Sequence, residues 1–233
     1  MVARRGDRYA GLNNRAKRRP NRHFGGRFAS MTRMTGDLNQ QGFRPLIVGI
    51  GGTTRSGSTS ERALQFALGK ARELGADTEL LAGPEIVLPI YAPETPERNA
   101  TAQHFVAVLR RAHGIIVASP GYHGSLSGLI KNALDYAEDM RNDRLPYFEG
   151  RAVGLIACAF GWQATGTTLS ALRSIVHALR GWPTPLGVAI NTSDSGFDKD
   201  NIGASAATGG QLTILARQVV QFAQQRAAWE SGA

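Results

Sequence analysis

The residues best suited to chemistry lie in one stretch, Leu46–Ser60, which reads LIVGIGGTTRSGSTS. Its second half, Gly51–Ser60, surrounds Arg55 with three glycines and six hydroxyl side chains. Loop amides and the first N–H groups of a helix can bind an anion there, because the helix dipole favours negative charge at its N-terminus. We therefore expect hydroxyls, amides and Arg55 to form a phosphate site. The alternative is an ordinary Gly/Ser turn between a strand and a helix.

Two familiar phosphate-binding loops do not fit this stretch. A P-loop needs G-x-x-x-x-G-K-[S/T], but Gly52–Thr59 reads GTTRSGST and has Ser58 in place of the lysine. A dinucleotide-binding loop needs the pattern G-x-G-x-x-G/A, and this chain has Thr54 where the third small residue belongs. The stretch is therefore suited to a single terminal phosphate. Ser58 followed by Glu61 also fits a capping box that would fix the start of the next helix.

A second candidate stretch, Ser119–Ser125, reads SPGYHGS. Its Pro-Gly pair is expected to turn the chain sharply and expose backbone amides, and Tyr122 can lay a flat ring beside a planar ligand. His123 and Ser125 add hydrogen-bonding groups, and Ser125 can cap the following helix. A loop with an aromatic ring and no acid or metal ligand suits a planar heterocycle better than a hydrolytic site. A tight turn with a surface tyrosine is the alternative.

The elements that must position these loops alternate between apolar strands and amphipathic helices. The expected strands are Leu46–Ile50, Thr78–Leu81, Gly114–Ala118, Ala152–Ala159 and Leu186–Ile190. This alternation indicates an α/β fold with helices on both faces of a parallel sheet. Right-handed crossovers favour a flavodoxin-like, doubly wound five-stranded sheet of order 2-1-3-4-5. Ligands of such sheets bind beyond the carboxyl ends of the strands, where the first and third strands carry the two candidate loops.

The charge of the chain is unevenly distributed. Residues 1–42 contain ten Arg and Lys against two Asp, a net charge of +8, whereas residues 43–233 contain 17 basic and 16 acidic residues, a net charge of +1. We expect residues 1–42 to be a disordered basic N-terminal tail and residues 43–233 to be one flavodoxin-like domain. The alternatives are attraction of the tail to RNA or to a membrane surface, an organelle transit peptide, or a true start at Met31 or Met34.

Other chemistry has little support in the sequence. The single cysteine, Cys158, excludes a disulfide framework and lies in an apolar strand, where a thiol is inert. No apolar run reaches the ~18–20 residues of a membrane span, and no secretory signal is visible, so the cytoplasm is the expected compartment. The expected polar loop Asn191–Gly210 carries Asp194, Asp198 and Asp200, but it lacks the other ligands of a calcium loop. No metal site is expected.

The segments GTTRSGSTS and SPGYHGSLSGLIKNALDY together resemble the NADPH-dependent FMN reductase family, over about residues 45 to 225. In that family the first loop has the form G-[S/T]-x-R-x-x-S and the second the form P-x-Y-[N/H]-x-S. The resemblance implies that the FMN phosphate is held by Thr53, Arg55, Ser58 and Ser60. It also implies that the isoalloxazine ring is lined by Pro120, Gly121, Tyr122 and His123, and Ser125 and Gly161 complete the expected cofactor-binding set.

The resemblance further implies FMN as cofactor and NADPH or NADH as co-substrate. Hydride would pass from the nicotinamide to FMN, and two electrons would then reach a small acceptor such as a quinone, free flavin, azo or nitro compound, or metal oxyanion. No catalytic side chain is expected, because the flavin carries the redox chemistry. The family implies a homodimer or homotetramer, with Leu129–Tyr136 at the interface. A flavodoxin-like electron carrier without NAD(P)H turnover is the alternative, and neither specific nucleic-acid binding nor a membrane is expected.

A third loop, Ala159–Gly166, follows the fourth expected strand. In the family this loop is usually rich in glycine, and here it departs from that pattern. Here Phe160 and Trp162 are bulky where small residues are common. These rings could stack on the flavin, narrow the nicotinamide site or pack within a core or interface.

Overall fold

The computed structural model describes residues 42–193 and 205–232. Nearly all of the predicted basic tail, residues 1–42, lies outside these residues, and so do Asp194, Asp198 and Asp200. The strands are β1 (Leu46–Gly51), β2 (Asp77–Leu81), β3 (Gly114–Tyr122), β4 (Ser125–Leu126), β5 (Ala152–Ala159), β6 (Trp182–Pro183) and β7 (Val188–Asn191). The helices are α2 (Thr59–Glu73), α3 (Ala100–Arg111), α4 (Gly128–Asp135), α5 (Trp162–Ala178) and α6 (Ala206–Gly232), with short 3-10 helices η2 (Gly83–Ile86) and η3 (Tyr136–Met140).

The sheet has the predicted order. Parallel strands β2, β1, β3 and β5 lie side by side in that sequence, and β7 pairs with the carboxyl end of β5. With β7 as the fifth main strand the order is 2-1-3-4-5, so the flavodoxin-like fold is confirmed. Two short strands were not expected: β6 pairs with the start of β5, and β4 forms an antiparallel hairpin with β3.

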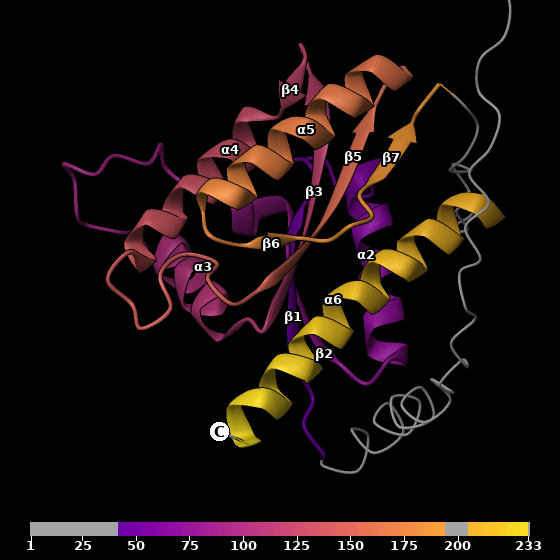
Figure 1. The fold of residues 1–233 in the computed structure, drawn as a ribbon. Helices are drawn as coiled ribbons and strands as arrows, with labels where there is room; N and C mark the ends of the chain where they lie inside the picture. Colours follow the sequence, from indigo (N-terminus) through magenta and orange to yellow (C-terminus); the bar gives the residue numbers. More distant parts are fainter. Residues whose placement is uncertain (1–41, 194–204, 233) are drawn as a thin grey trace, which may run out of the picture. The chain divides into compact units, whose positions relative to one another are not determined.

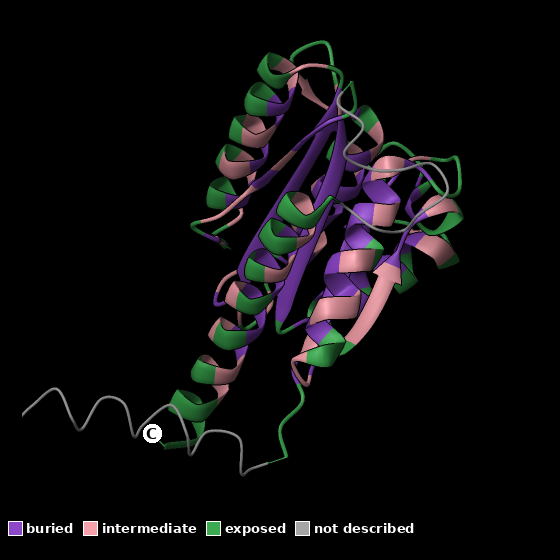
Figure 2. Ribbon diagram, turned by 90° about the vertical axis from the view of Figure 1, so that its right-hand side faces the viewer, coloured by how far each residue is buried: buried purple, intermediate pink, exposed green. Residues whose placement is uncertain are grey.

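Helices cover both faces of this sheet (Figure 1). Helices α2 and α6 pack on one face, and α3, α4 and α5 pack on the other. In β1, Val48 and Ile50 contribute to the cluster beneath α3, α4 and α5, whereas Ile47 contributes to the opposite cluster. A strand buried on both faces needs apolar residues at every position, which explains the unbroken apolar run in the sequence. Figure 2 shows the buried strands and the exposed outer sides of the helices.

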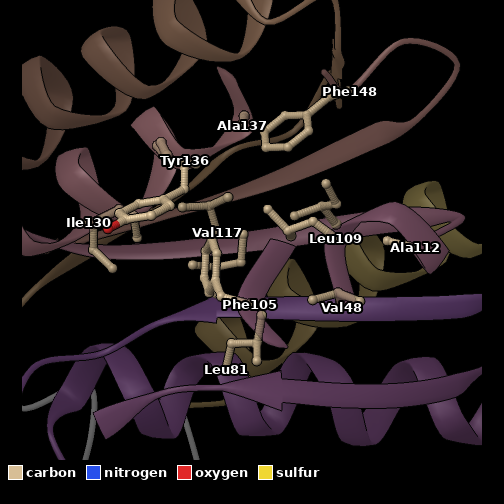
Figure 3. Close-up of a cluster of buried hydrophobic side chains, with 14 of the residues drawn as sticks. Val48, Leu81, Phe105, Leu109, Ala112, Val117, Ile130, Tyr136, Ala137 and Phe148 are labelled. Atoms are coloured by element: carbon tan, nitrogen blue, oxygen red, sulfur yellow. The ribbon is translucent and has the colours of Figure 1, made fainter. Parts of the chain in front are cut away.

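The larger hydrophobic cluster contains the rings that anchor η3 (Figure 3). Tyr136 is 2% exposed, and its ring meets that of Phe105 edge to face at 6.5 Å between centroids. The Tyr136 hydroxyl donates a hydrogen bond to the carbonyl oxygen of Pro89 at 3.0 Å, so its polar group is satisfied at the edge of the core.

Two predicted boundaries were wrong. Strand β3 runs on to Tyr122, through residues expected to form a loop. Helix α6 begins at Ala206, although Gly209 and Gly210 disfavour helix locally, because the buried Leu212 and Leu215 hold this helix against the sheet. None of the helices within residues 42–193 and 205–232 combines the length and the hydropathy needed to cross a bilayer.

Candidate cofactor site

The first loop leaves β1 at a point where its backbone touches β3. A Cβ atom on Gly51 would collide with the carbonyl oxygen of Ala118 and lie 2.9 Å from the Ala118 Cβ. Gly52 follows with φ of +95°, in the left-handed region that favours glycine, and its N–H donates to the same Ala118 oxygen at 3.3 Å. These two glycines therefore bring the first loop directly beside β3.

The start of α2 confirms half of the predicted capping box. Ser58 is the N-cap residue, and its Oγ accepts a hydrogen bond from the Glu61 N–H at 3.3 Å. The Glu61 carboxylate bonds one residue further back than expected: Oε2 accepts from the Gly57 N–H at 3.0 Å and Oε1 accepts from Gln65 at 3.1 Å. An acidic side chain that is 8% exposed therefore closes the loop from within.

The side chains predicted to hold a phosphate divide into two groups. Arg55 is exposed, and Thr53 is partly exposed, with its Oγ1 hydrogen-bonded to both the N–H and the carbonyl oxygen of Arg55 at 3.1 Å. Ser58 and Ser60 are 3% and 2% exposed, and their hydroxyl oxygens lie 3.3 Å apart. Arg55 is thus exposed to solvent, whereas the buried Ser58 and Ser60 stabilise the loop on its inner side.

The second stretch is a hairpin rather than the predicted sharp Pro-Gly turn. Pro120 lies within β3, opposite Cys158 of β5, and the chain turns only after Tyr122. His123 and Gly124 have φ of +50° and +85°, as a two-residue type I′ turn requires. Tyr122 is 54% exposed. The hairpin tip therefore presents Tyr122 and His123 to solvent beyond the edge of the sheet.

The base of this hairpin packs tightly on α5. A Cβ atom on Gly121 would lie 2.5 Å from Thr168 Oγ1 and 2.9 Å from the Ala159 Cβ. The Thr168 hydroxyl donates to the Ser125 carbonyl oxygen at 3.2 Å, which ties β4 to α5. The prediction that Ser125 caps the next helix was wrong: Ser127 is the N-cap of α4 and accepts from its third N–H at 3.2 Å.

The third loop joins β5 to α5. Gly161 is the N-cap residue of α5 with φ of +95°, and its N–H donates to Asn191 Oδ1 at 2.7 Å. On either side of it Phe160 is 82% exposed and Trp162 is 63% exposed. Sequence reasoning did not identify Asn191. Its only signal was a carboxamide directly after the fifth apolar run, at the edge where the candidate loops gather.

The structure brings the ten predicted cofactor-binding residues to the carboxyl ends of three neighbouring strands, β1, β3 and β5. These residues are Thr53, Arg55, Ser58, Ser60, Pro120, Gly121, Tyr122, His123, Ser125 and Gly161. Their chemistry fits FMN. An exposed guanidinium beside the N-terminus of helix α2 suits a phosphate, and an exposed tyrosine ring at the hairpin tip suits a flat heterocycle.

Two titratable side chains near the sheet have structural roles. Burial raises the pKa of the Cys158 thiol to about 12, so the sulfur is an inert part of the core. His113 Nδ1 accepts a hydrogen bond from the Leu46 N–H at 3.0 Å. Burial, and to a smaller extent the charge of Arg151, lowers the pKa of His113. Within the described part of the chain, no three His, Cys, Asp or Glu side chains are grouped so as to hold a metal ion.

A parallel sheet of order 2-1-3-4-5 with both unusual loops at its switch point defines the flavodoxin-like class. Within that class, the family model of NADPH-dependent FMN reductases matches residues 45–194. The chain belongs to this family of oxidoreductases.

Curated relatives agree with this assignment. An FMN-dependent NADPH-azoreductase of Staphylococcus aureus is 37% identical over 112 residues, which make up 46% of this chain and 55% of the relative. The chain thus spans about half the length of the curated relatives that it matches.

Among solved structures, the flavoenzyme NAD(P)H:(acceptor) oxidoreductase FerB of Paracoccus denitrificans has a TM-score of 0.64 at 17% identity, with 79% of this chain and 99% of that chain covered. An NADH:FMN oxidoreductase, EMOB, has a TM-score of 0.58 at 22% identity, covering 78% of this chain and 89% of that chain. Both share the fold.

Proposed function

We propose that this chain is an FMN-dependent NAD(P)H oxidoreductase that reduces a small-molecule acceptor. The observation that carries the proposal is the meeting of two loops: the Gly/Ser/Thr loop after β1 lies against β3, which ends in the aromatic hairpin. The family and its azoreductase relatives support the same activity. When bound, FMN would take a hydride from NADPH or NADH and deliver two electrons to the acceptor.

The residues of this chain would bind and orient the flavin. The exposed guanidinium of Arg55 and the loop amides before α2 would hold the phosphate, while Thr53, Ser58 and Ser60 fix the loop that presents them. Pro120 and Gly121 form the base from which Tyr122 and His123 reach the ring, and Ser125 and Gly161 border it. No side chain of the site has to exchange a proton with the substrate for hydride transfer to occur.

Flavin titration combined with steady-state kinetics tests the activity. Purified protein should bind FMN, followed by flavin fluorescence, and should then oxidise NADPH or NADH with a quinone or ferricyanide as acceptor. Failure to bind FMN contradicts the proposal. FMN binding without nicotinamide oxidation instead favours a flavodoxin-like electron carrier.

Arg55→Ala tests the proposed phosphate contact. A charge-assisted hydrogen bond contributes about 1.5–3 kcal/mol, so FMN affinity should fall at least about tenfold. Riboflavin, which lacks the phosphate, should bind as it does to the unmodified protein. Arg72→Ala, at the far end of α2 where the side chain donates to Thr78, is the matched control and should change neither affinity.

The proposed oligomer is a homodimer or homotetramer formed through the region of α4. Ile90 and Val87 are 83% and 52% exposed, and the segment that carries them is tied to α4 by Asn132, whose Nδ2 donates to the Pro89 carbonyl oxygen at 2.9 Å. Exposed apolar side chains attached to this helix suit a protein interface. Light scattering should report a multimer, and Ile90→Asp should weaken it.

The proposed compartment is the cytoplasm. Cys158 is a free thiol, as is usual for proteins of reducing compartments. Microscopy of the fluorescently tagged protein in its native host tests this.

A further inference from the structure

Exposed aromatic rings concentrate at one edge of the described domain. Phe43 packs edge to face on His113, and Trp182 packs on Phe222, so these exposed rings have aromatic partners. Within residues 42–193 and 205–232, the exposed Phe, Tyr and Trp rings without a ring partner are those of Tyr122, Phe160, Trp162 and Trp229. Three of these four lie where β3 and β5 end.

The backbone that carries Phe160 and Trp162 is held firmly although the two side chains are not packed. The Gly161 N–H donates to Asn191 Oδ1 at 2.7 Å, and the Gly161 carbonyl oxygen accepts from the Thr165 N–H at 3.2 Å. The Thr165 hydroxyl, which comes from the next turn of α5, donates to the Trp162 carbonyl oxygen at 2.8 Å. Two exposed rings on a fixed backbone are suited to contact a partner without a large loss of conformational entropy.

Asn191 connects this loop to the end of β7. Besides Gly161, its Oδ1 accepts from both the N–H and the hydroxyl of Ser193, at 3.1 and 2.7 Å. The residue is 7% exposed. All three of these hydrogen bonds use one oxygen atom as acceptor, and they fix the third loop relative to the sheet.

The third loop also lies beside the hairpin that carries Tyr122. Pro120 of β3 pairs with Cys158 of β5, and a Cβ atom on Gly121 would touch Ala159, so the two strands stay side by side up to the last residue of β5. Tyr122, the last residue of β3, and Phe160 and Trp162, which follow β5, are therefore carried by neighbouring strand ends at the proposed flavin site.

We propose that Phe160 and Trp162 form the binding surface for a planar aromatic electron acceptor, and that Asn191 is a positioning residue for it. This inference rests on the proposed function and assigns to this chain the residues that select among the possible acceptors. Aromatic rings prefer to stack against other flat rings, which distinguishes a two-ring quinone from a compact inorganic oxidant. Reduction of the quinone to the hydroquinone takes the hydride that NADPH supplies together with one proton from water, and NADP⁺ is the oxidised product.

Acceptor selectivity is the first test. With Phe160→Ala and Trp162→Ala, the KM for a two-ring quinone should rise about five- to tenfold, while the KM for ferricyanide and the affinity for FMN stay unchanged. Trp229→Ala removes a ring of similar exposure, 80%, far along α6, and should change none of these values. Equal effects on both acceptors, or none on the quinone, would overturn the proposal.

The role of Asn191 is tested by a conservative substitution. Asn191→Ala should raise the quinone KM as the ring substitutions do, whereas Asn191→Asp should restore it, because the aspartate retains an oxygen that accepts from Gly161 and Ser193. A general loss of stability would instead raise the KM for ferricyanide too. If Asn191→Asp behaves like Asn191→Ala on both acceptors, Asn191 is not a positioning residue.

A direct binding measurement separates this inference from the proposed activity. The chain has three tryptophans, so Trp182→Phe/Trp229→Phe leaves Trp162 as the single tryptophan, and Trp162→Phe/Trp182→Phe leaves Trp229. The quinone should quench Trp162 with saturation and Trp229 only in proportion to its concentration, with or without FMN. Linear quenching of both overturns the binding surface, whatever the activity.

A second copy of the chain is the other possible binding partner of Phe160 and Trp162, and the oligomeric state tests it. Light scattering should give the same mass for Phe160→Ala, Trp162→Ala and the unmodified protein. Dissociation of a multimer by either substitution would assign the rings to a subunit interface and overturn the proposal.

Discussion

Gly121→Ala should displace the hairpin that carries Tyr122. The new methyl group would lie 2.5 Å from Thr168 Oγ1 and 2.9 Å from the Ala159 Cβ, so neighbouring atoms must move. Overpacking of this kind costs about 1–3 kcal/mol. Rotation of Thr168 away from the methyl would also break its hydrogen bond to Ser125, another ~0.5–1.5 kcal/mol. Alanine also restricts the unfolded chain more than glycine does, which stabilises the fold by ~0.4–1 kcal/mol. The net loss in the free energy of unfolding is therefore about 2 kcal/mol.

Chemical denaturation of the variant measures this loss, and titrations with FMN and riboflavin measure the displacement. Both flavins should bind more weakly, because the contact affected is to the ring. Gly128→Ala is the matched control, since nothing lies within 4 Å of its Cβ position, and it should leave stability unchanged or higher. Thr168→Ala combined with Gly121→Ala should recover part of the loss. Equal free energies of unfolding for Gly121→Ala and Gly128→Ala would show that the close contact of Gly121 with α5 does not require glycine.

Two further predictions concern charge. Glu61→Gln retains an oxygen for the Gly57 N–H but removes a negative charge beside the proposed phosphate, so FMN affinity should rise several-fold while riboflavin affinity stays constant; an equal rise for both flavins would contradict it. The pKa of His113 is lowered from 6.5, so the unfolded chain binds a proton more readily than the folded protein does. The contribution of neutral His113 to the free energy of unfolding should therefore be fully present above about pH 6.5 and decrease as the pH falls towards the folded pKa. Denaturation at pH 5 and 7.5 measures the difference, which His113→Gln should reduce; an unchanged pH dependence in that variant would assign the effect to other groups.

Much of the fold could be predicted because its signals are local. The apolar run beginning at Leu46 is buried on both faces, and the strand order follows from the alternation of strands and helices. The first loop was recognisable because glycines and hydroxyls directly follow that run. The Glu61 N–H to Ser58 bond was predictable for the same reason, since capping depends on residues three positions apart.

The features that were missed depend on contacts between distant residues. Pro120 belongs to a strand because β5 continues beside it, which the Pro-Gly pair does not reveal. The turn at His123 and Gly124 lacks the usual Asn-Gly signature of a type I′ hairpin. Asn191 accepts a hydrogen bond from Gly161, 30 positions away in the sequence, so the residues around either one do not indicate the contact. Helix α4 is capped by Ser127 instead of Ser125, because Ser125 is paired in the hairpin.

The hydrogen bonds of Glu61 within the first loop bear on how FMN would bind to the protein. Glu61 joins Gly57 to Gln65 through hydrogen bonds within the chain, so the shape of the loop depends on these residues themselves. A loop fixed by its own side chains should form during folding, before a flavin binds. Binding of FMN to the purified protein should therefore be rapid and reversible, without a slow refolding phase.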